Sequence, residues 1–82
     1  MSQLNNDKQT ILNRMIETGI AIKQLEHAID IAIGLGDKRS VDVLSQAQEA
    51  REMDLEDYQE NLETVNREIA KAERILNKVI NG

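Results

Sequence analysis

Two runs of apolar residues, spaced in alternating steps of three and four, constrain this 82-residue chain more than any other feature. This spacing places side chains on one side of an α-helix and is typical of helices that pair along a seam. The first run comprises Leu4, Ile11, Met15, Thr18, Ile22, Leu25, Ile29 and Ala32, with Lys8 filling one position. The second comprises Leu55, Tyr58, Leu62, Val65, Ile69, Ala72, Leu76 and Val79. The spacing therefore predicts two long helices.

The segment between the two runs has the residues of a turn. Gly34 and Gly36 can take the left-handed conformation that ends a helix, and Asp37 or Ser40 can cap the next helix. Tyr58 is the only aromatic residue and there is no Pro, Trp or Phe, which disfavours β-sheet. We expect an all-α fold class with one helical domain over residues 1–82: helix 1 about 4–33, turn 34–40, helix 2 about 41–80.

Folding the chain at the glycines predicts a two-helix antiparallel hairpin that resembles a coiled coil. The expected layers pair Ile29 with Leu44, Thr18 with Leu55, Met15 with Tyr58, Ile11 with Leu62, and Leu4 with Ile69. Extending the second run toward the turn places polar Gln48 and Arg51 in the seam. A local shift in the repeat would put Ala47 there in place of Gln48, and the sequence leaves both arrangements open.

The second run continues beyond the last residue that helix 1 can cover. We call residues 72–80 the overhang; its apolar side chains extend over about 12 Å at ~1.5 Å per residue. They are Ala72, Ile75, Leu76, Val79 and Ile80. Apolar side chains on an uncovered helix end favour contact with another molecule.

Helix 1 also carries apolar residues outside its seam, where they would face water in an isolated hairpin: Leu12, Ile16, Ile20, Ile31 and Ile33. Gly19 lies among them, as a tolerated weak position or as a point of close approach for another backbone. These residues and the overhang predict a homodimer in which two hairpins form a four-helix bundle, with helix 1 central. Contact with a different protein is the alternative.

The charge is unevenly distributed. The net charge of −5 disfavours direct binding of nucleic acid or acidic lipid. Seven acidic residues against Arg51 give residues 49–63 a net charge of −6. Glu52, Glu56 and Glu60 share one helical face, which is either a solvated surface or a site for a basic partner. A mimic of DNA phosphates is a further alternative.

The sequence also predicts the compartment. No leader peptide is visible in residues 1–10, and the mainly apolar stretch 28–35 is far shorter than the ~20 residues of a membrane span. There is no cysteine, which fits a reducing compartment. We expect a soluble, cytoplasmic protein without membrane insertion.

Residues that could carry chemistry are few. His27 and Asp30 are too few ligands to close a metal site, and Gly34 to Ser40 do not have phosphate-loop spacing. We expect no metal, no cofactor and no enzyme activity. Ser45-Gln46-Ala47-Gln48-Glu49 resembles, in its first two residues, the Ser-Gln-Glu-Leu-Asp motif of helical hairpins that dephosphorylate response-regulator aspartates. That resemblance implies a phosphatase as the enzyme alternative.

In size, acidity and uninterrupted helix, the whole chain resembles small accessory regulators of large tailed phages, among them cytoplasmic antiholins. The resemblance implies restraint of a partner, one with a basic or amphipathic segment, by complex formation. We therefore expect a regulator that sequesters or inhibits another protein through an apolar stripe bordered by an acidic face. A structural subunit that assembles with itself is the main alternative. The expected contact residues are Ala72, Ile75, Leu76, Val79, Ile80, Leu12, Ile16, Ile20, Glu52, Glu56 and Glu60.

Overall fold

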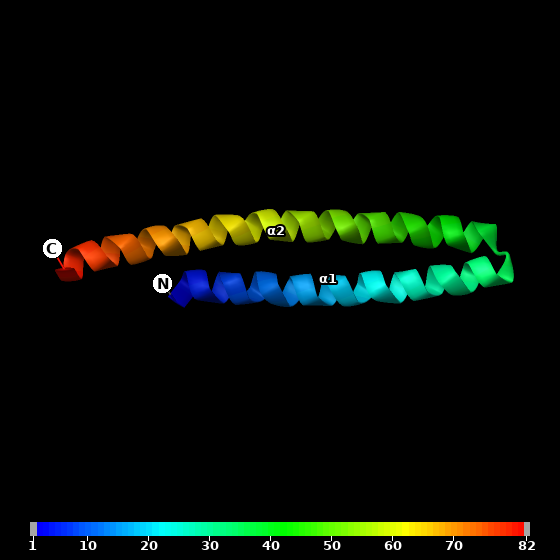
Figure 1. Ribbon diagram of the computed structural model, residues 1–82, viewed down its shortest axis with the longest axis horizontal. Coiled ribbons are helices and arrows are strands. Elements are labelled where there is room, and N and C mark those ends of the chain that lie inside the picture. The colour runs from blue at the N-terminus through cyan, green and yellow to red at the C-terminus, as the bar shows by residue number, and fades with distance from the viewer. Residues whose placement is uncertain (1, 82) are drawn as a thin grey trace.

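The protein is a hairpin of two long antiparallel helices, as the computed structural model in Figure 1 shows. The structure describes residues 2–81. Helix α1 covers Ser2–Leu35 (34 residues) and helix α2 covers Lys38–Asn81 (44 residues). No strand occurs in the described part of the chain, so the expected all-α fold is confirmed. The turn is shorter than expected, because residues 34 and 35 still belong to α1 and residues 38–40 already belong to α2.

Hydrogen bonds at the turn explain why the chain reverses at Gly36. Gly36 has φ +70°, the left-handed conformation that costs glycine little. Its N–H donates to the Ile33 carbonyl, and the Asp37 N–H donates to the Ala32 carbonyl, each over 3.0 Å. This pair of bonds is the Schellman motif that ends a helix. Gly34 remains helical, so only one of the two glycines takes the left-handed conformation.

Asp37 caps the first turn of α2. Its Oδ1 accepts a 3.1 Å hydrogen bond from the Ser40 N–H, and its carbonyl accepts a 3.1 Å bond from the Val41 N–H. Its Oδ2 accepts a 2.6 Å bond from the Ser40 hydroxyl. The hydrogen bonds from Ser40 hold the pKa of the Asp37 carboxyl below its usual value, and the bond from the Ser40 side chain has a larger effect than the bond from the Ser40 backbone. Asp37 is therefore the cap, and Ser40 supports it.

The seam between the helices follows the expected repeat. All eight residues of the first run, and Lys8, are buried or half-buried, as are the residues of the second run up to Ala72. Gln48 is half-buried whereas Ala47 is exposed, so the repeat passes through Gln48 without a shift. Arg51, the next seam position, is exposed. Ile11 lies in one groove with Asn61 and Val65, in agreement with the expected pairing of Ile11 with Leu62.

The hairpin is too thin to enclose a core. It measures 68 × 14 × 14 Å, and Ala32 and Thr18 are the only buried residues among those the structure describes. Its accessible surface is 6441 Å² for a mass of 9.3 kDa. A compact monomer of this mass exposes about 5,000 Å². The hairpin thus leaves about 1,400 Å² more in contact with water than a compact fold would. No helix in the described chain is long and apolar enough to cross a bilayer.

Candidate protein-binding surface

The overhang is an uncovered apolar surface at one end of the rod. Helix α2 is ten residues longer than α1, and Figure 1 shows its C-terminal end extending past the first residues of α1. Val79 is 77% exposed and Ile80 is 69% exposed; Ile75 and Leu76 are also exposed, and Ala72 is half-buried. The five expected residues therefore form one stripe that no part of the described chain covers beyond Ala72.

The outer face of α1 carries a second apolar surface at the middle of the rod. Ile16 is 61% exposed, and Ile20, one turn further on, is also exposed. Leu12 differs from expectation: it is half-buried, because it is next to Ile11 at the edge of the seam. A Cβ atom added at Gly19 would meet nothing within 4 Å. Within one chain, the absence of a side chain at Gly19 is therefore not needed to avoid a clash.

A third apolar surface surrounds the turn. Ile31 and Ile33 are exposed, as expected, and Leu35 is 78% exposed. Val43, on the first turns of α2, is exposed as well. Neither Leu35 nor Val43 is among the residues expected from the sequence, and Leu35 falls within the expected turn. Val43 is an apolar residue outside the seam, as Ile31 is, so the sequence holds the signal for it. Met53 is a further exposed residue of this kind.

The acidic face of α2 is open to solvent. Glu52, Glu56 and Glu60 are exposed, and within the described chain none of them has a basic side chain within ion-pair distance. The nearby Arg51 pairs with Asp54, with 3.8 Å between Nη1 and Oδ2. This pair leaves the three glutamates, which we call the carboxylate ladder, unneutralised. The overhang begins at Ala72, twelve residues after Glu60, which is about 18 Å further along the helix. The structure therefore does not bring the acidic face to the border of the overhang.

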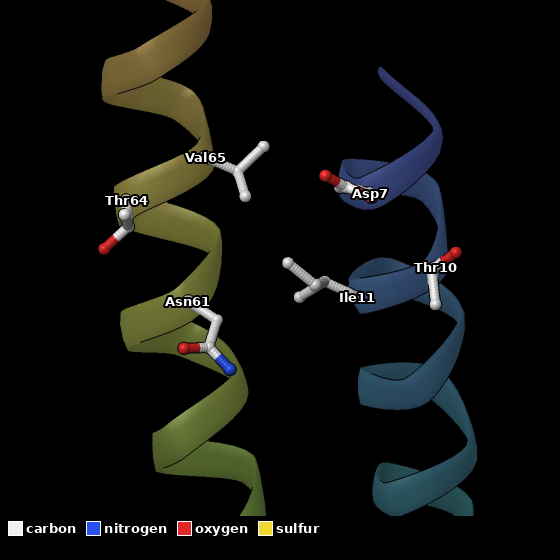
Figure 2. A pocket seen from close by; sticks show the side chains of 6 residues that line it. All are labelled: Asp7, Thr10, Ile11, Asn61, Thr64 and Val65. Atoms are coloured by element: carbon white, nitrogen blue, oxygen red, sulfur yellow. The ribbon is translucent and has the colours of Figure 1, made fainter. Parts of the chain in front are cut away.

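The groove at the open end of the hairpin has no catalytic arrangement. Asp7, Thr10, Ile11, Asn61, Thr64 and Val65 line it. Figure 2 shows Ile11 and Val65 pointing into the space between the helices. The Thr64 hydroxyl points away from α1 and donates to the Glu60 carbonyl over 3.2 Å. Asp7 is the only titratable residue of the groove and accepts a 3.2 Å bond from Gln3. A nucleophile with a neighbouring base is absent from this groove.

The remaining candidates for chemistry lie apart on exposed helix. His27 is exposed, and the described residues contain no group of three side chains able to hold a metal ion. In the segment 45–49, Ser45 and Gln48 are half-buried, whereas Gln46 and Glu49 are exposed. The Gln48 amide donates to Glu26 of α1 over 3.5 Å. The segment thus contributes its Gln48 to the contact between the helices.

No protein-family model, no curated protein and no solved structure matches this chain.

Proposed function

We propose that the chain is a small protein-binding regulator: a hairpin that pairs with a second copy and, as a dimer, sequesters or inhibits another protein. The observation that carries this proposal is the exposed apolar stripe of the overhang on a hairpin whose described residues are almost all exposed or half-buried. Contiguous apolar surface of this kind is typical of interaction sites. Pairing of two hairpins into a four-helix bundle would cover it and the outer face of α1.

The acidic face suggests the chemistry of the other protein. Glu52, Glu56 and Glu60 are four residues apart, so each adjacent pair of like charges destabilises the helix by a few tenths of a kcal/mol. A basic or amphipathic segment would relieve this repulsion, and exposed carboxylates increase the rate of encounter with such a segment. The lack of cysteine fits the reducing cytoplasm, where we expect the complex to form.

Two single substitutions with the same change in charge test the binding function. The proposal predicts that the wild-type chain, tagged and recovered from its native cells, retains one unrelated protein in stoichiometric amount. Leu76→Asp places a carboxylate in the stripe and should abolish that retention, together with self-association. Asn77→Asp is the matched control: Asn77 is next to Leu76 in the sequence, but its side chain is exposed and outside the seam, so binding should persist. Retention of the same protein by Leu76→Asp would contradict the proposed role of the stripe.

The alternative function, a structural subunit that assembles only with itself, is supported by the same exposed surface. It predicts that only further copies of the chain are recovered, again lost in Leu76→Asp. Stoichiometric recovery of one unrelated protein separates the regulator from this alternative. A phosphatase of response-regulator aspartates would instead release phosphate from a phosphorylated receiver domain, and the activity would fall when Gln46 is replaced by Ala.

A further inference from the structure

Apart from Met53, the exposed large apolar side chains gather at three places along the 68 Å rod. Ile31, Ile33, Leu35 and Val43 lie at the turn, and we call them the turn cluster. Ile16 and Ile20 lie near the middle of α1, next to the half-buried Leu12, and we call the three the central cluster. The overhang lies at the opposite end from the turn. Any partner that covers all three must match their spacing.

The three surfaces are spaced symmetrically. In the expected register Ile16, the middle residue of the central cluster, lies level with residue 57 of α2, next to Tyr58, which lines one groove with Thr18. From this level Val43 is 14 residues away toward the turn, about 21 Å at ~1.5 Å per residue, and Leu35 lies near the start of α2, about 28 Å away. Ile75 of the overhang is 18 residues away in the other direction, about 27 Å. A two-fold axis at Ile16 would therefore place the central cluster against itself and each overhang against a turn cluster.

We infer that a second copy of this chain packs alongside the first in the opposite direction, with central cluster on central cluster and each overhang against the other copy's turn cluster. The inference rests on the self-association in the proposed function and adds its arrangement. In a parallel pair, by contrast, both overhangs would lie at one end and both turn clusters at the other, so each surface could meet only the same surface of the other copy.

The charges at the two ends favour the same arrangement. The overhang contains Arg74 and Lys78 against Glu73, a net charge of +1. The turn region 30–43 contains Asp30, Asp37 and Asp42 against Lys38 and Arg39, a net charge of −1. An antiparallel pair brings these opposite charges together at both ends. In a parallel pair, each overhang would lie beside the other overhang and each turn region beside the other turn region, so that like net charges would repel.

Helix geometry allows the contact. The Gly19 position has no side chain, and nothing within 4 Å occupies the space beside it, so a partner helix can approach α1 closely there. Helices in four-helix bundles cross at about 20°. Supercoiling at this small angle keeps paired helices in contact along their length, so the ends of the pair can touch as well as its centre. A standard interface buries about 800 Å² on each partner, less than the ~1,400 Å² of extra surface on each hairpin.

A double cysteine variant, Leu35→Cys with Val79→Cys, tests the arrangement. The native chain has no cysteine, so the two new thiols are the only ones present. Both positions are more than three-quarters exposed, so the hairpin should fold normally. The two residues lie near opposite ends of the 68 Å rod, and a disulfide requires Cα atoms within about 7 Å, so none can form within one hairpin. Oxidised glutathione would supply the oxidant.

The antiparallel pair predicts covalent dimers in which mass spectrometry finds the peptide around position 35 of one copy linked to the peptide around position 79 of the other. Links between two copies of position 79, or between two copies of position 35, would overturn the arrangement in favour of parallel or end-to-end contact. A dimer mass by light scattering with no link from position 35 to position 79 would also overturn it, while leaving self-association intact. A monomer mass at every concentration would reject both the arrangement and the self-association in the proposed function.

Discussion

The side-chain amide of Gln48 donates a hydrogen bond to Glu26 across the seam, with 3.5 Å between Nε2 and Oε1. Within the described residues it is the one side-chain hydrogen bond that joins α1 to α2. The distance is at the upper limit for a hydrogen bond, so the bond contributes little energy. A polar residue in an apolar seam instead specifies which residues pair, at a cost in stability.

Replacing Gln48 with leucine should therefore stabilise the hairpin. Gln48→Leu puts an apolar side chain at a half-buried seam position, and we expect the free energy of unfolding to rise by about 1 kcal/mol. Urea denaturation followed by circular dichroism measures the change. Ala47→Leu, at the exposed neighbouring position, should change it much less. A loss of stability in Gln48→Leu would show that the bond to Glu26 outweighs apolar packing.

Leu62 tests the register of the two helices. Leu62→Asp places a carboxylate opposite Ile11, and burial of an unpaired charge costs several kcal/mol, so we expect most of the helix signal at about 25 °C to be lost. Because Leu62 is half-buried, some of that cost is relieved by water. Asn61→Asp adds the same charge at an exposed position and should retain full helicity. If Leu62→Asp also retained full helicity, the pairing of Ile11 with Leu62 would be wrong.

The two glycines before Asp37 should respond in opposite directions to alanine. Gly36→Ala forces a side chain into φ +70°, which costs roughly 1–2 kcal/mol. Gly34→Ala replaces a helical glycine that has free space around its Cβ position, and should stabilise the hairpin by roughly 0.5–1 kcal/mol. Thermal unfolding of the two variants provides the comparison. Equal effects would mean that Gly36 does not end α1.

Stability should fall at low pH through Asp37. Hydrogen bonds from Ser40 lower the pKa of this carboxyl in the folded chain, so the stabilisation is present above the unfolded pKa of about 3.9. It is lost as pH falls through the lower pKa of the folded state. Asp37→Asn still caps α2 but does not titrate. The difference in melting temperature between the wild type and Asp37→Asn should therefore change only below about pH 4. A change near neutral pH would exclude this cause.

The carboxylate ladder should make stability depend on salt. Glu56→Gln removes repulsion from both Glu52 and Glu60, and we expect a gain of a few tenths of a kcal/mol at low salt. Glu63→Gln is the matched control: Glu63 has Arg67 four residues later and Glu60 three residues before, so the lost attraction and the removed repulsion should nearly cancel. The gain in Glu56→Gln should shrink in about 1 M salt, where the screening length is about 3 Å. If both variants gained stability, the cause would be the lower net charge of the chain and not the repulsion within the ladder.

The pattern of residues along the chain was enough to predict the two helices, the seam and the overhang. A helix forms through bonds between residues four apart, so its period can be read locally from positions such as Leu62 and Ile69. The region in which the chain reverses follows from where the glycines lie.

Which residues are covered depended instead on the opposite helix. Three features became clear only in the folded hairpin. They are the presence of Gln48 and not Ala47 in the seam, the partial burial of Leu12, and the left-handed conformation at Gly36 and not Gly34. Each is settled by atoms distant in sequence or by the path of the backbone through the turn. The exposure of Leu35 and Val43 has the same origin, because Leu35 is the last residue of α1 and Val43 lies outside the seam, so neither side chain is covered by the opposite helix.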